Sequence, residues 1–220
     1  MSDRAAKDEL YDGFSVVAKA LANGRRAEII DVLSQGERSV EDLAAEIGQS
    51  VANTSQHLRH LARAGLLRTR RDGNHIFYSP ASPSVADLWQ ALRAVAADHV
   101  AEVDRLATRY LGDRDGLETI SRDELARRLP TGEVIVLDVR PVAEYRAGHI
   151  LGARPVPIGQ LHVELDQLTK GHDIVAYCRG PYCVYADDAV RELVSRGHPA
   201  RRLEDGYPEW AKAGLPTARG

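Results

Sequence analysis

Cys178 and Cys183 are the only two cysteines of this 220-residue chain, and both lie in the short sequence YCRGPYC (177–183). A cysteine thiolate is a nucleophile, and a second thiol nearby can attack sulfur that the first has taken up. The apolar run DIVAYC (173–178) leads into this segment, and a helical pattern follows it. Since α/β folds place their chemistry where a buried parallel strand ends, we predict that Cys178 is a reactive thiol.

The loop that follows Cys178 has features that favour a thiolate over a thiol. Its backbone amides can form an anion-binding nest, and the next helix presents the positive end of its dipole. Arg179 adds a cation, so we expect the pKa of the Cys178 thiol to be lowered. The predicted catalytic residues are Cys178, Arg179, Gly180, Tyr182 and Cys183.

Two residues of the loop each allow two interpretations. Cys183 is either a resolving thiol, which attacks a persulfide on Cys178 to give a disulfide or a sulfur-bridged link, or a small apolar residue at the helix start. Pro181 either stiffens the loop, where it removes one amide donor, or is only a turn residue.

The elements that position this loop alternate between strand and helix. VIVLDV (134–139) and DIVAYC (173–178) are short, β-branched apolar runs of the kind found in buried parallel strands. Helical patterns accompany them at 121–129, at about 158–168 and at 184–196. This alternation predicts an α/β domain with a mostly parallel sheet.

The first half of the chain is mainly α-helical in pattern, with a single hairpin. Ser39 is a good N-cap for a helix that ends at Gly48, and Asp42 occupies the capping-box position. Ser50 begins a second helix over 51–64. Two short helices joined by a tight connection predict a helix-turn-helix.

A hairpin after the second helix predicts a wing. The strands 66–71 and 75–79 flank Asp72-Gly73-Asn74, a strong turn signal. Between residues 56 and 78 there are five arginines and one acidic residue, a local positive charge that suits DNA phosphates. The side chains expected to contact DNA are Ser50, Asn53, Thr54, Gln56, His57, Arg59, His60, Arg68, Arg70 and Arg71.

The net charge, the number of cysteines and the length of the apolar runs limit the class of protein. The formal net charge of −3 conceals the basic segment, and two cysteines are too few for a disulfide-stapled secreted domain. The N-terminus lacks the apolar run of a signal peptide, and no stretch approaches the roughly 20 apolar residues of a membrane span. We therefore expect a cytoplasmic protein with no membrane partner. The polar, glycine-flanked segment 113–116 predicts a linker between domains at 1–112 and 117–220.

Residues 16–80 resemble the ArsR/SmtB family of winged-helix repressors. The most specific part is the run S-x-H-L-x-x-L-x-x-A-G-L at Ser55–Leu66, which leads into R-x-G. The resemblance implies a homodimer on double-stranded operator DNA, with the first and last helices of the domain at the dimer interface. A helical pattern over 85–111 fits the role of the last helix.

Many members of that family sense metals, and this sequence departs from their motifs. Where a C-x-C-D-L motif holds their thiolates, this chain has Ser39-Val-Glu-Asp-Leu43, without sulfur. Asp98 and His99 lie in the last helical pattern, but they are adjacent, and His99 has no histidine partner further along. Zinc takes about four convergent ligands, so we predict no metal site.

The second half, from about Leu117 to Thr217, resembles the rhodanese family. The residues that match its first and last motifs are Asp138, Arg140, Glu144, Tyr145, Gly148, His149, Ile150, Gly152, Ala153, Gly206, Trp210, Gly214 and Pro216. The resemblance implies that Cys178 carries sulfane sulfur in a cradle at 179–183, with no cofactor except a covalent persulfide. Asp138, Arg140, Glu144 and His149 are expected to organise the structure and not to catalyse. Val184 stands where related phosphatases and arsenate reductases carry an arginine, which argues against oxyanion chemistry.

Two hypotheses follow. In the first, the chain is a DNA-binding transcriptional regulator that senses or carries reactive sulfur at Cys178, from a small sulfur donor or to an acceptor. In the second, it is a sulfurtransferase of the thiosulfate type, and the DNA-binding domain only tethers it to the chromosome or controls its own gene. We favour the regulator, with sulfurtransferase chemistry as its input.

Overall fold

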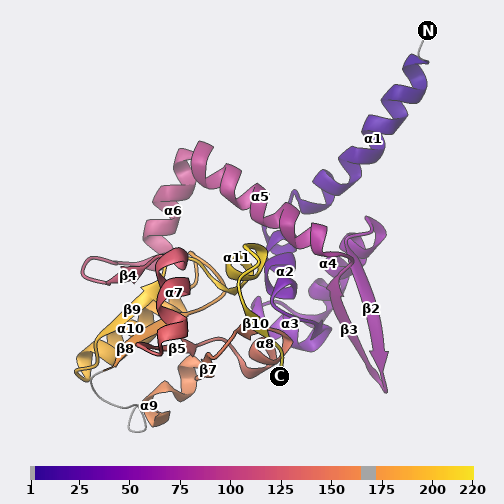
Figure 1. Cartoon of the computed structure of the whole chain (residues 1–220). Coiled ribbons are helices and arrows are strands. Elements are labelled where there is room, and N and C mark those ends of the chain that lie inside the picture. Colours follow the sequence, from indigo (N-terminus) through magenta and orange to yellow (C-terminus); the bar gives the residue numbers. More distant parts are fainter. Residues whose placement is uncertain (1–2, 165–171) are drawn as a thin grey trace. The chain divides into compact units, whose positions relative to one another are not determined.

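Figure 1 shows the computed structural model, which describes residues 3–164 and 172–220. The chain divides at Val100 into two units, Met1–His99 and Val100–Gly220. The single helix expected over 85–111 is interrupted there, because Val100 has extended backbone angles (φ −110°, ψ 91°) between α5 (Pro83–His99) and α6 (Ala101–Leu111). The segment 113–116, expected to be a linker, therefore falls within the second unit.

The helix-turn-helix forms in the first unit as predicted. α3 (Val40–Glu46) begins after Ser39, and the capping box with Asp42 is present. α4 (Val51–Arg63) begins after Ser50, whose side chain accepts a hydrogen bond from the Asn53 amide. Gly65 then takes a left-handed conformation (φ +75°), which lets the chain leave α4 and enter the wing.

The wing is a three-stranded antiparallel sheet in the order β1-β3-β2. β2 (Leu67–Asp72) and β3 (His75–Pro80) form the predicted hairpin, with Asp72 opposite His75. β1 (Arg38–Ser39) adds the third strand by pairing with β3. A strand this short carries no periodicity, so the sequence did not predict it.

The core of the first unit joins the helix-turn-helix to three further helices. Leu58 and Leu61 of α4 are fully buried against Ile29 and Ile30 of α2 (Gly24–Ser34). α1 (Arg4–Leu21) contributes its C-terminal end to the same cluster. α5 is tied to α2 because the Trp89 indole donates to the Asp31 carboxylate at 2.5 Å.

The second unit contains the predicted parallel sheet, with strand order β4-β9-β8-β5-β7. At its centre β5 (Val134–Asp138) pairs in parallel with β8 (Asp173–Tyr177), and β8 pairs with β9 (Ala200–Leu203). β4 (Thr119–Ile120) and β7 (Arg154–Pro155) form the edges, also in parallel. A separate antiparallel pair joins β6 (His149–Ile150) to β10 (Thr217–Ala218).

Helices cover both faces of this sheet, and the side chains of β8 alternate between them. Ile174 and Ala176 pack with α10 (Val184–Ser195) and α9 (Leu161–Glu164), whereas Val175 and Tyr177 pack with α7 (Arg122–Arg128) and α11 (Tyr207–Lys212). Cys178 continues the first set, so it faces α10. The last short helix is α8 (Val142–Ala147).

The helix expected over about 158–168 is present as far as the described residues extend. It begins as a 3-10 turn at Ile158–Gln160 and continues as α9 to Glu164. Residues 165–168 of that prediction lie outside the described residues. The other two predicted helices of this half correspond to α7, which Ser121 caps, and to α10.

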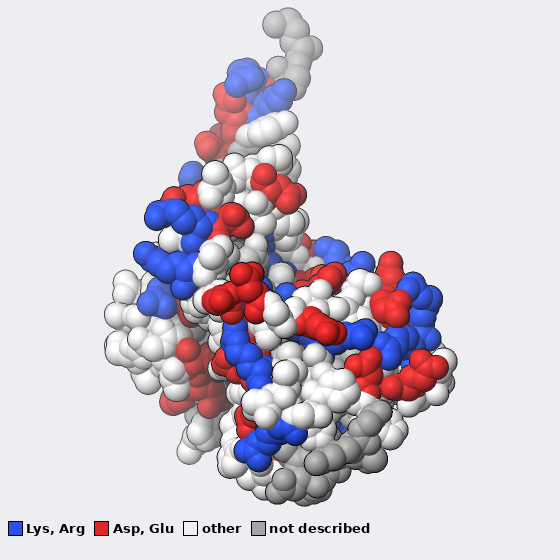
Figure 2. All heavy atoms as spheres, turned by 90° about the vertical axis from the view of Figure 1, so that its left-hand side faces the viewer, with Lys and Arg blue, Asp and Glu red and all other residues white. Residues whose placement is uncertain are grey.

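Charge is mixed on the face of the molecule that Figure 2 shows, where basic and acidic side chains are interspersed. Exposed ion pairs three residues apart occur on two helices of the second unit, Arg105 with Glu102 on α6 and Arg127 with Glu124 on α7. Within the part of the chain that the structure describes, every helix is too short or too polar to span a bilayer.

Candidate functional site

The two cysteines are joined by a disulfide, with their Cα atoms 6.3 Å apart. Cys178 follows the last residue of β8 and is 1% exposed, and Cys183 occupies the N-cap position of α10. Both pack in the cluster between the sheet and α10. The fold therefore brings the candidate resolving thiol into bonding reach of the candidate nucleophile. Residues 178–183, which we call the sulfur loop, are in the oxidised state.

Arg179, expected from the sequence to add a cation near Cys178, is paired with the Glu144 carboxylate. Its Nε lies 3.0 and 3.1 Å from the two carboxylate oxygens of Glu144, and its Nη2 lies 2.5 Å from one of them. Glu144 is fully buried, so this bidentate pair neutralises the guanidinium. Any thiolate on Cys178 would depend on the loop amides and the start of α10 for its stabilisation.

Gly180 is fixed by the beginning of α11. A Cβ placed on Gly206 would lie 2.3 Å from the Gly180 nitrogen, so only glycine fits at position 206. The next residue, Tyr207, donates its amide to the Cys178 carbonyl at 3.1 Å. These contacts hold the first half of the sulfur loop against α11.

Tyr182, in the second half of the loop, lines a groove of about 800 Å³. The rest of the groove is formed by α6 and by the residues that follow α6, up to Asp115. Arg114, just beyond α6, also lines this groove. Its Nη2 donates to the Pro181 carbonyl at 3.1 Å, and its Nε donates to Asp187 of α10 at 2.7 Å. The second half of the loop is thus held from the α6 side.

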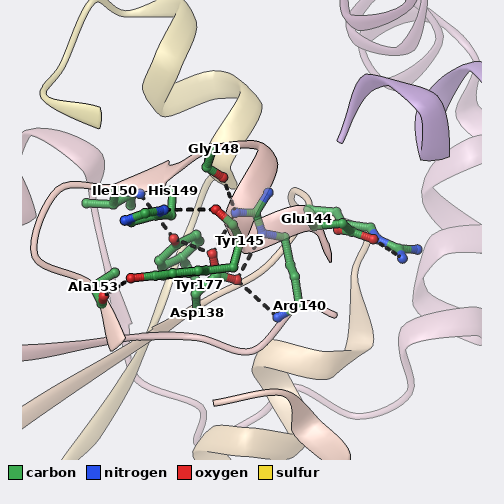
Figure 3. A network of polar contacts seen from close by, with 10 residues as sticks. Asp138, Arg140, Glu144, Tyr145, Gly148, His149, Ile150, Ala153 and Tyr177 are labelled. Atoms are coloured by element: carbon green, nitrogen blue, oxygen red, sulfur yellow. Dashed lines mark hydrogen bonds and ion pairs between the residues drawn. The ribbon is translucent and has the colours of Figure 1, made fainter. Parts of the chain in front are cut away.

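The buried polar network beside the loop supports the structural role predicted for Asp138 and Arg140 (Figure 3). Arg140 donates from Nη2 to Asp138 at 2.6 Å and to the Gly148 carbonyl at 2.7 Å. The Tyr177 hydroxyl donates to Asp138 at 2.5 Å and accepts from the Ile150 amide. Burial raises the pKa of Tyr177, so it remains a neutral donor. Burial opposes the charge of Arg140, but its bonds to Asp138 outweigh that cost and raise its pKa.

His149 belongs to the same region, where it lies against Tyr145 (Figure 3). Its ring stacks on Tyr145 with centroids 3.7 Å apart, and its Nδ1 lies 2.8 Å from the Tyr145 carbonyl oxygen. The Tyr145 hydroxyl in turn donates to the Ala153 carbonyl. These contacts give His149 a role in ordering the loop after α8.

Nine of the ten residues predicted to contact DNA are at least partly accessible, and one is not. Thr54 is fully buried, and its hydroxyl donates to the Ser50 carbonyl at 3.0 Å. The expectation that it contacts DNA is wrong, because it lies on the same side of α4 as Leu58 and Leu61. The exposed members on α4 and its cap are Ser50, Asn53, Gln56, Arg59 and His60.

His57 is the half-buried member of the set on α4. Burial lowers its pKa, and the nearby positive charges of Arg26, His60 and Arg25 lower it further. Its imidazole is therefore neutral near pH 7 and can act only as a neutral hydrogen-bonding group there.

The three wing arginines are exposed, but each has a partner within the wing. Arg70 lies 2.6 Å from Glu37 and 3.0 Å from Asp72, and its guanidinium stacks over Phe77. The hydrogen bond from Arg70 lowers the pKa of Glu37. Arg68 donates to Ser79 at 2.9 Å, and Arg71 donates to the Gly73 carbonyl.

The structure adds residues that sequence reasoning missed. Arg114 lay in a segment read as a linker, and nothing in its surroundings signalled a contact with a loop 67 positions away. Asp187 carried a signal, because it is a carboxylate within the apolar pattern of α10 and is fully buried. Within residues 3–164 and 172–220, no group of three or more His, Cys, Asp or Glu side chains is placed to hold a metal ion.

Both halves of the chain match known protein families. Residues 23–69 match the bacterial regulatory proteins of the arsR family, and residues 121–213 match the rhodanese-like domain. The first match covers the helix-turn-helix and the start of the wing. The second covers the polar network, the sulfur loop and all of the sheet except the edge strand β4.

The chain is 47% identical to the HTH-type transcriptional regulator Rv0324 of Mycobacterium tuberculosis, over all of this chain and 95% of that protein. Its second half is 31% identical to a sulfurtransferase of Allochromatium vinosum, over 44% of this chain and 91% of that one. Its first half is 41% identical to a homodimeric winged helix-turn-helix DNA-binding domain from Mycobacterium bovis, a possible ArsR-family regulator. That similarity covers 46% of this chain and 93% of the other, with a TM-score of 0.43.

Proposed function

Because this chain belongs to the ArsR family of DNA-binding transcriptional regulators and carries a rhodanese-like domain, we propose that it responds to sulfane sulfur through Cys178 and Cys183. The observation that carries the proposal is the bond between the two cysteines at the end of β8. A transferase that acts through Cys178 alone has no need of a second thiol in bonding reach, whereas a two-state sensor does.

The chemistry balances with a persulfide R–S–SH as the donor. The Cys178 thiolate attacks the outer sulfur, R–S⁻ leaves, and Cys178 becomes a persulfide. The Cys183 thiolate then attacks the Cys178 sulfur, the bond to the outer sulfur breaks, and hydrosulfide leaves. The donor is thereby reduced to R–SH and H₂S, and the two thiols are oxidised to the disulfide.

The output of the proposed sensor is a change in DNA binding by α4 and the wing. Gln56, Arg59 and His60 project from α4 on the side opposite Leu58 and Leu61, which suits the major groove of double-stranded operator DNA. A tenfold change in affinity requires only about 1.4 kcal/mol of coupling between the sulfur loop and this face.

The regulator acts as a homodimer in this proposal. α1 exposes Leu10, Tyr11 and Phe14, and Phe14 is 63% exposed. α5 exposes Leu88, Leu92 and Val95 at four- and three-residue spacing, which forms an apolar stripe. Side chains of this size are seldom left in water, so a second copy is the expected cover. Sedimentation of Phe14→Ser and Leu92→Ser variants tests this, because a dimer through these faces should shift to monomer.

The experiment for sensing compares operator binding before and after treatment with inorganic polysulfide, without oxygen. The DNA is a duplex selected from a randomised library by the untreated protein. We expect wild type to change affinity by about tenfold and Cys178→Ser to be unaffected. Cys183→Ser should stop at a persulfide, visible by mass spectrometry as one added sulfur atom. If wild type forms the disulfide and its affinity does not change, sensing through this pair is wrong.

A second candidate, catalytic sulfur transfer, is favoured by the similarity of the second half to a sulfurtransferase. Its test is steady transfer from thiosulfate to cyanide, lost in Cys178→Ser. The disulfide argues for sensing first, because Cys178 cannot attack a donor while it is bonded to Cys183. If Cys183→Ser transfers sulfur faster than wild type, the second cysteine inhibits the transfer reaction. If both proteins transfer sulfur at the same slow rate, the result favours a sensor.

A further inference from the structure

Arg114 connects the end of α6 to the sulfur loop. It lies three positions beyond Leu111, the last residue of α6, and its side chain is 27% exposed. One guanidinium nitrogen donates to the carbonyl of Pro181, which lies between the two cysteines, and another donates to Asp187. A single side chain therefore bridges α6, the loop and α10.

The Asp187 carboxylate anchors this bridge. It is fully buried, and Arg202 of β9 approaches its other oxygen at 3.2 Å. Two guanidinium groups thus share one carboxylate, and the pKa of Arg202 is lowered by burial and by repulsion from Arg114. The Pro181 carbonyl supplies further negative potential to Arg114, so this contact offsets part of the repulsion.

The contact falls on the second half of the loop. Arg179 is held by Glu144, and Gly180 is packed against Gly206, so the first half has fixed neighbours. Pro181 and Tyr182 lie in the second half, which the bond between Cys178 and Cys183 closes into a ring. When that bond is broken, the ring opens, and the segment that Arg114 contacts is no longer part of a closed ring.

The end of α6 is also held to α10 by a second, independent contact. Arg191 donates to the Asp113 carbonyl at 2.6 Å and pairs with Asp188 of the same helix. This contact does not involve the loop, so it supplies a matched control for Arg114. Along the chain, Val100 connects α6 to α5 of the winged-helix unit.

We propose that Arg114 is the positioning residue of the sulfur loop: it holds Pro181 in the geometry of the disulfide and transmits the loss of that geometry to α6. This inference rests on the proposed function, because it assigns a regulatory meaning to the thiol and disulfide states of the same pair. Linkage makes the effect reciprocal, so a contact that depends on the disulfide must also stabilise the disulfide.

The test is a redox titration of the full chain in glutathione buffers, with the Cys178–Cys183 pair followed by thiol alkylation. Arg114→Lys keeps a cation beside Asp187, but one ammonium cannot reproduce the paired geometry of a guanidinium toward two acceptors. We expect Arg114→Lys and Arg114→Gln to make the disulfide about tenfold easier to reduce, a shift of about 30 mV for a two-electron couple. Arg191→Ala should titrate like wild type.

A second measurement tests transmission to α6. For the selected duplex, the ratio of affinities between oxidised and reduced protein should fall toward one in Arg114→Lys and stay at the wild-type value in Arg191→Ala. If the midpoint of the redox titration is unchanged in Arg114→Lys, the positioning role is wrong. If the midpoint shifts but the ratio of DNA affinities between oxidised and reduced protein is unchanged, transmission to α6 is wrong.

The failure of the proposed function gives a different pattern from the failure of this inference. If sensing is wrong, oxidised and reduced wild-type protein bind DNA with the same affinity. The redox midpoints of the Arg114 variants still decide, in that case, whether Arg114 positions the loop. Should Arg114→Gln fail to fold, Arg114→Lys alone carries the comparison, because it retains the charge that Asp187 requires.

Discussion

Around the sulfur loop the charged side chains are buried in pairs, whereas along α4 and the wing they are exposed to solvent. Asp138, Glu144 and Asp187 are all fully buried, each within reach of an arginine. Arg59 and His60 lie on the surface, and Arg70 forms only solvent-exposed pairs. A substitution in the first region should therefore change the stability of the fold, while one in the second should change binding alone.

The largest expected effect is that of Asp138→Asn, which removes the carboxylate that is hydrogen-bonded to the buried Arg140 guanidinium. We expect it to lower the free energy of unfolding of the second unit by about 3–5 kcal/mol. Urea unfolding can be followed by the fluorescence of buried Trp210 in a Trp89→Phe background. The control is Asp123→Asn, whose carboxylate is 82% exposed, and we expect no measurable change. If both variants lose the same small amount of unfolding free energy, the buried pairs do not stabilise the fold more than exposed charges do.

The next effect is the loss of DNA affinity in Arg59→Ala. Removing one phosphate contact should weaken binding to all sequences and reduce the slope of log affinity against log salt by about one. Unfolding of both units should stay as in wild type, because Arg59 is exposed. Arg105→Ala, an exposed arginine of α6, is the control and should leave the slope unchanged. A slope equal to wild type in Arg59→Ala would place Arg59 away from the DNA.

A smaller effect is expected for Glu37→Gln, and it is opposite in sign. The change removes the stronger partner of Arg70 and a negative charge next to the wing. We expect DNA affinity to rise about two- to fivefold, in line with the modest free energy of an exposed ion pair. In an Arg70→Ala background the same change should give a smaller gain, which a fluorescence-anisotropy cycle of the four proteins measures. Equal gains in both backgrounds would show that Arg70 is not the residue released.

The smallest effect concerns pH and His57. Because burial lowers its pKa in the folded state, the unfolded chain binds a proton more readily at this position. Its contribution therefore reduces the stability of the first unit as pH falls from about 6.5, the ordinary histidine pKa, toward the lowered value. His57→Gln should lose less stability than wild type between pH 7 and pH 5, measured by urea unfolding. A greater loss in His57→Gln would reverse the sign of this argument.

Much of the fold could be predicted, because strong local signals and the two domain patterns agree. Ser39 with Asp42, Ser50 and the β5 and β8 runs mark elements that the structure contains. The break at Val100 was missed, since neither proline nor glycine stands there and the apolar spacing runs on through it. An apolar pattern that continues across a position therefore does not show whether the helix continues there.

The candidate site was predictable in its residues but not in its pairings. The sequence singled out Cys178 and Cys183, and it left open whether the second thiol meets the first. It identified Arg179 as a cation near Cys178 but gave no sign of its pairing with Glu144, a buried carboxylate 35 positions earlier. Thr54 was misplaced for a related reason, because a small polar residue can satisfy its hydroxyl within the helix and face inward.

The position of Asp187 has a consequence for where the chain may be cut. The rhodanese pattern begins near Leu117, and a fragment that starts there would lose Arg114 while keeping the buried carboxylate it neutralises. A fragment that starts at Val100 keeps both partners, together with α6 and the Asp113 contact to Arg191. The smallest unit that keeps Asp187 paired with Arg114 therefore extends upstream of the rhodanese pattern, and a unit that begins at Val100 also contains the whole of α6.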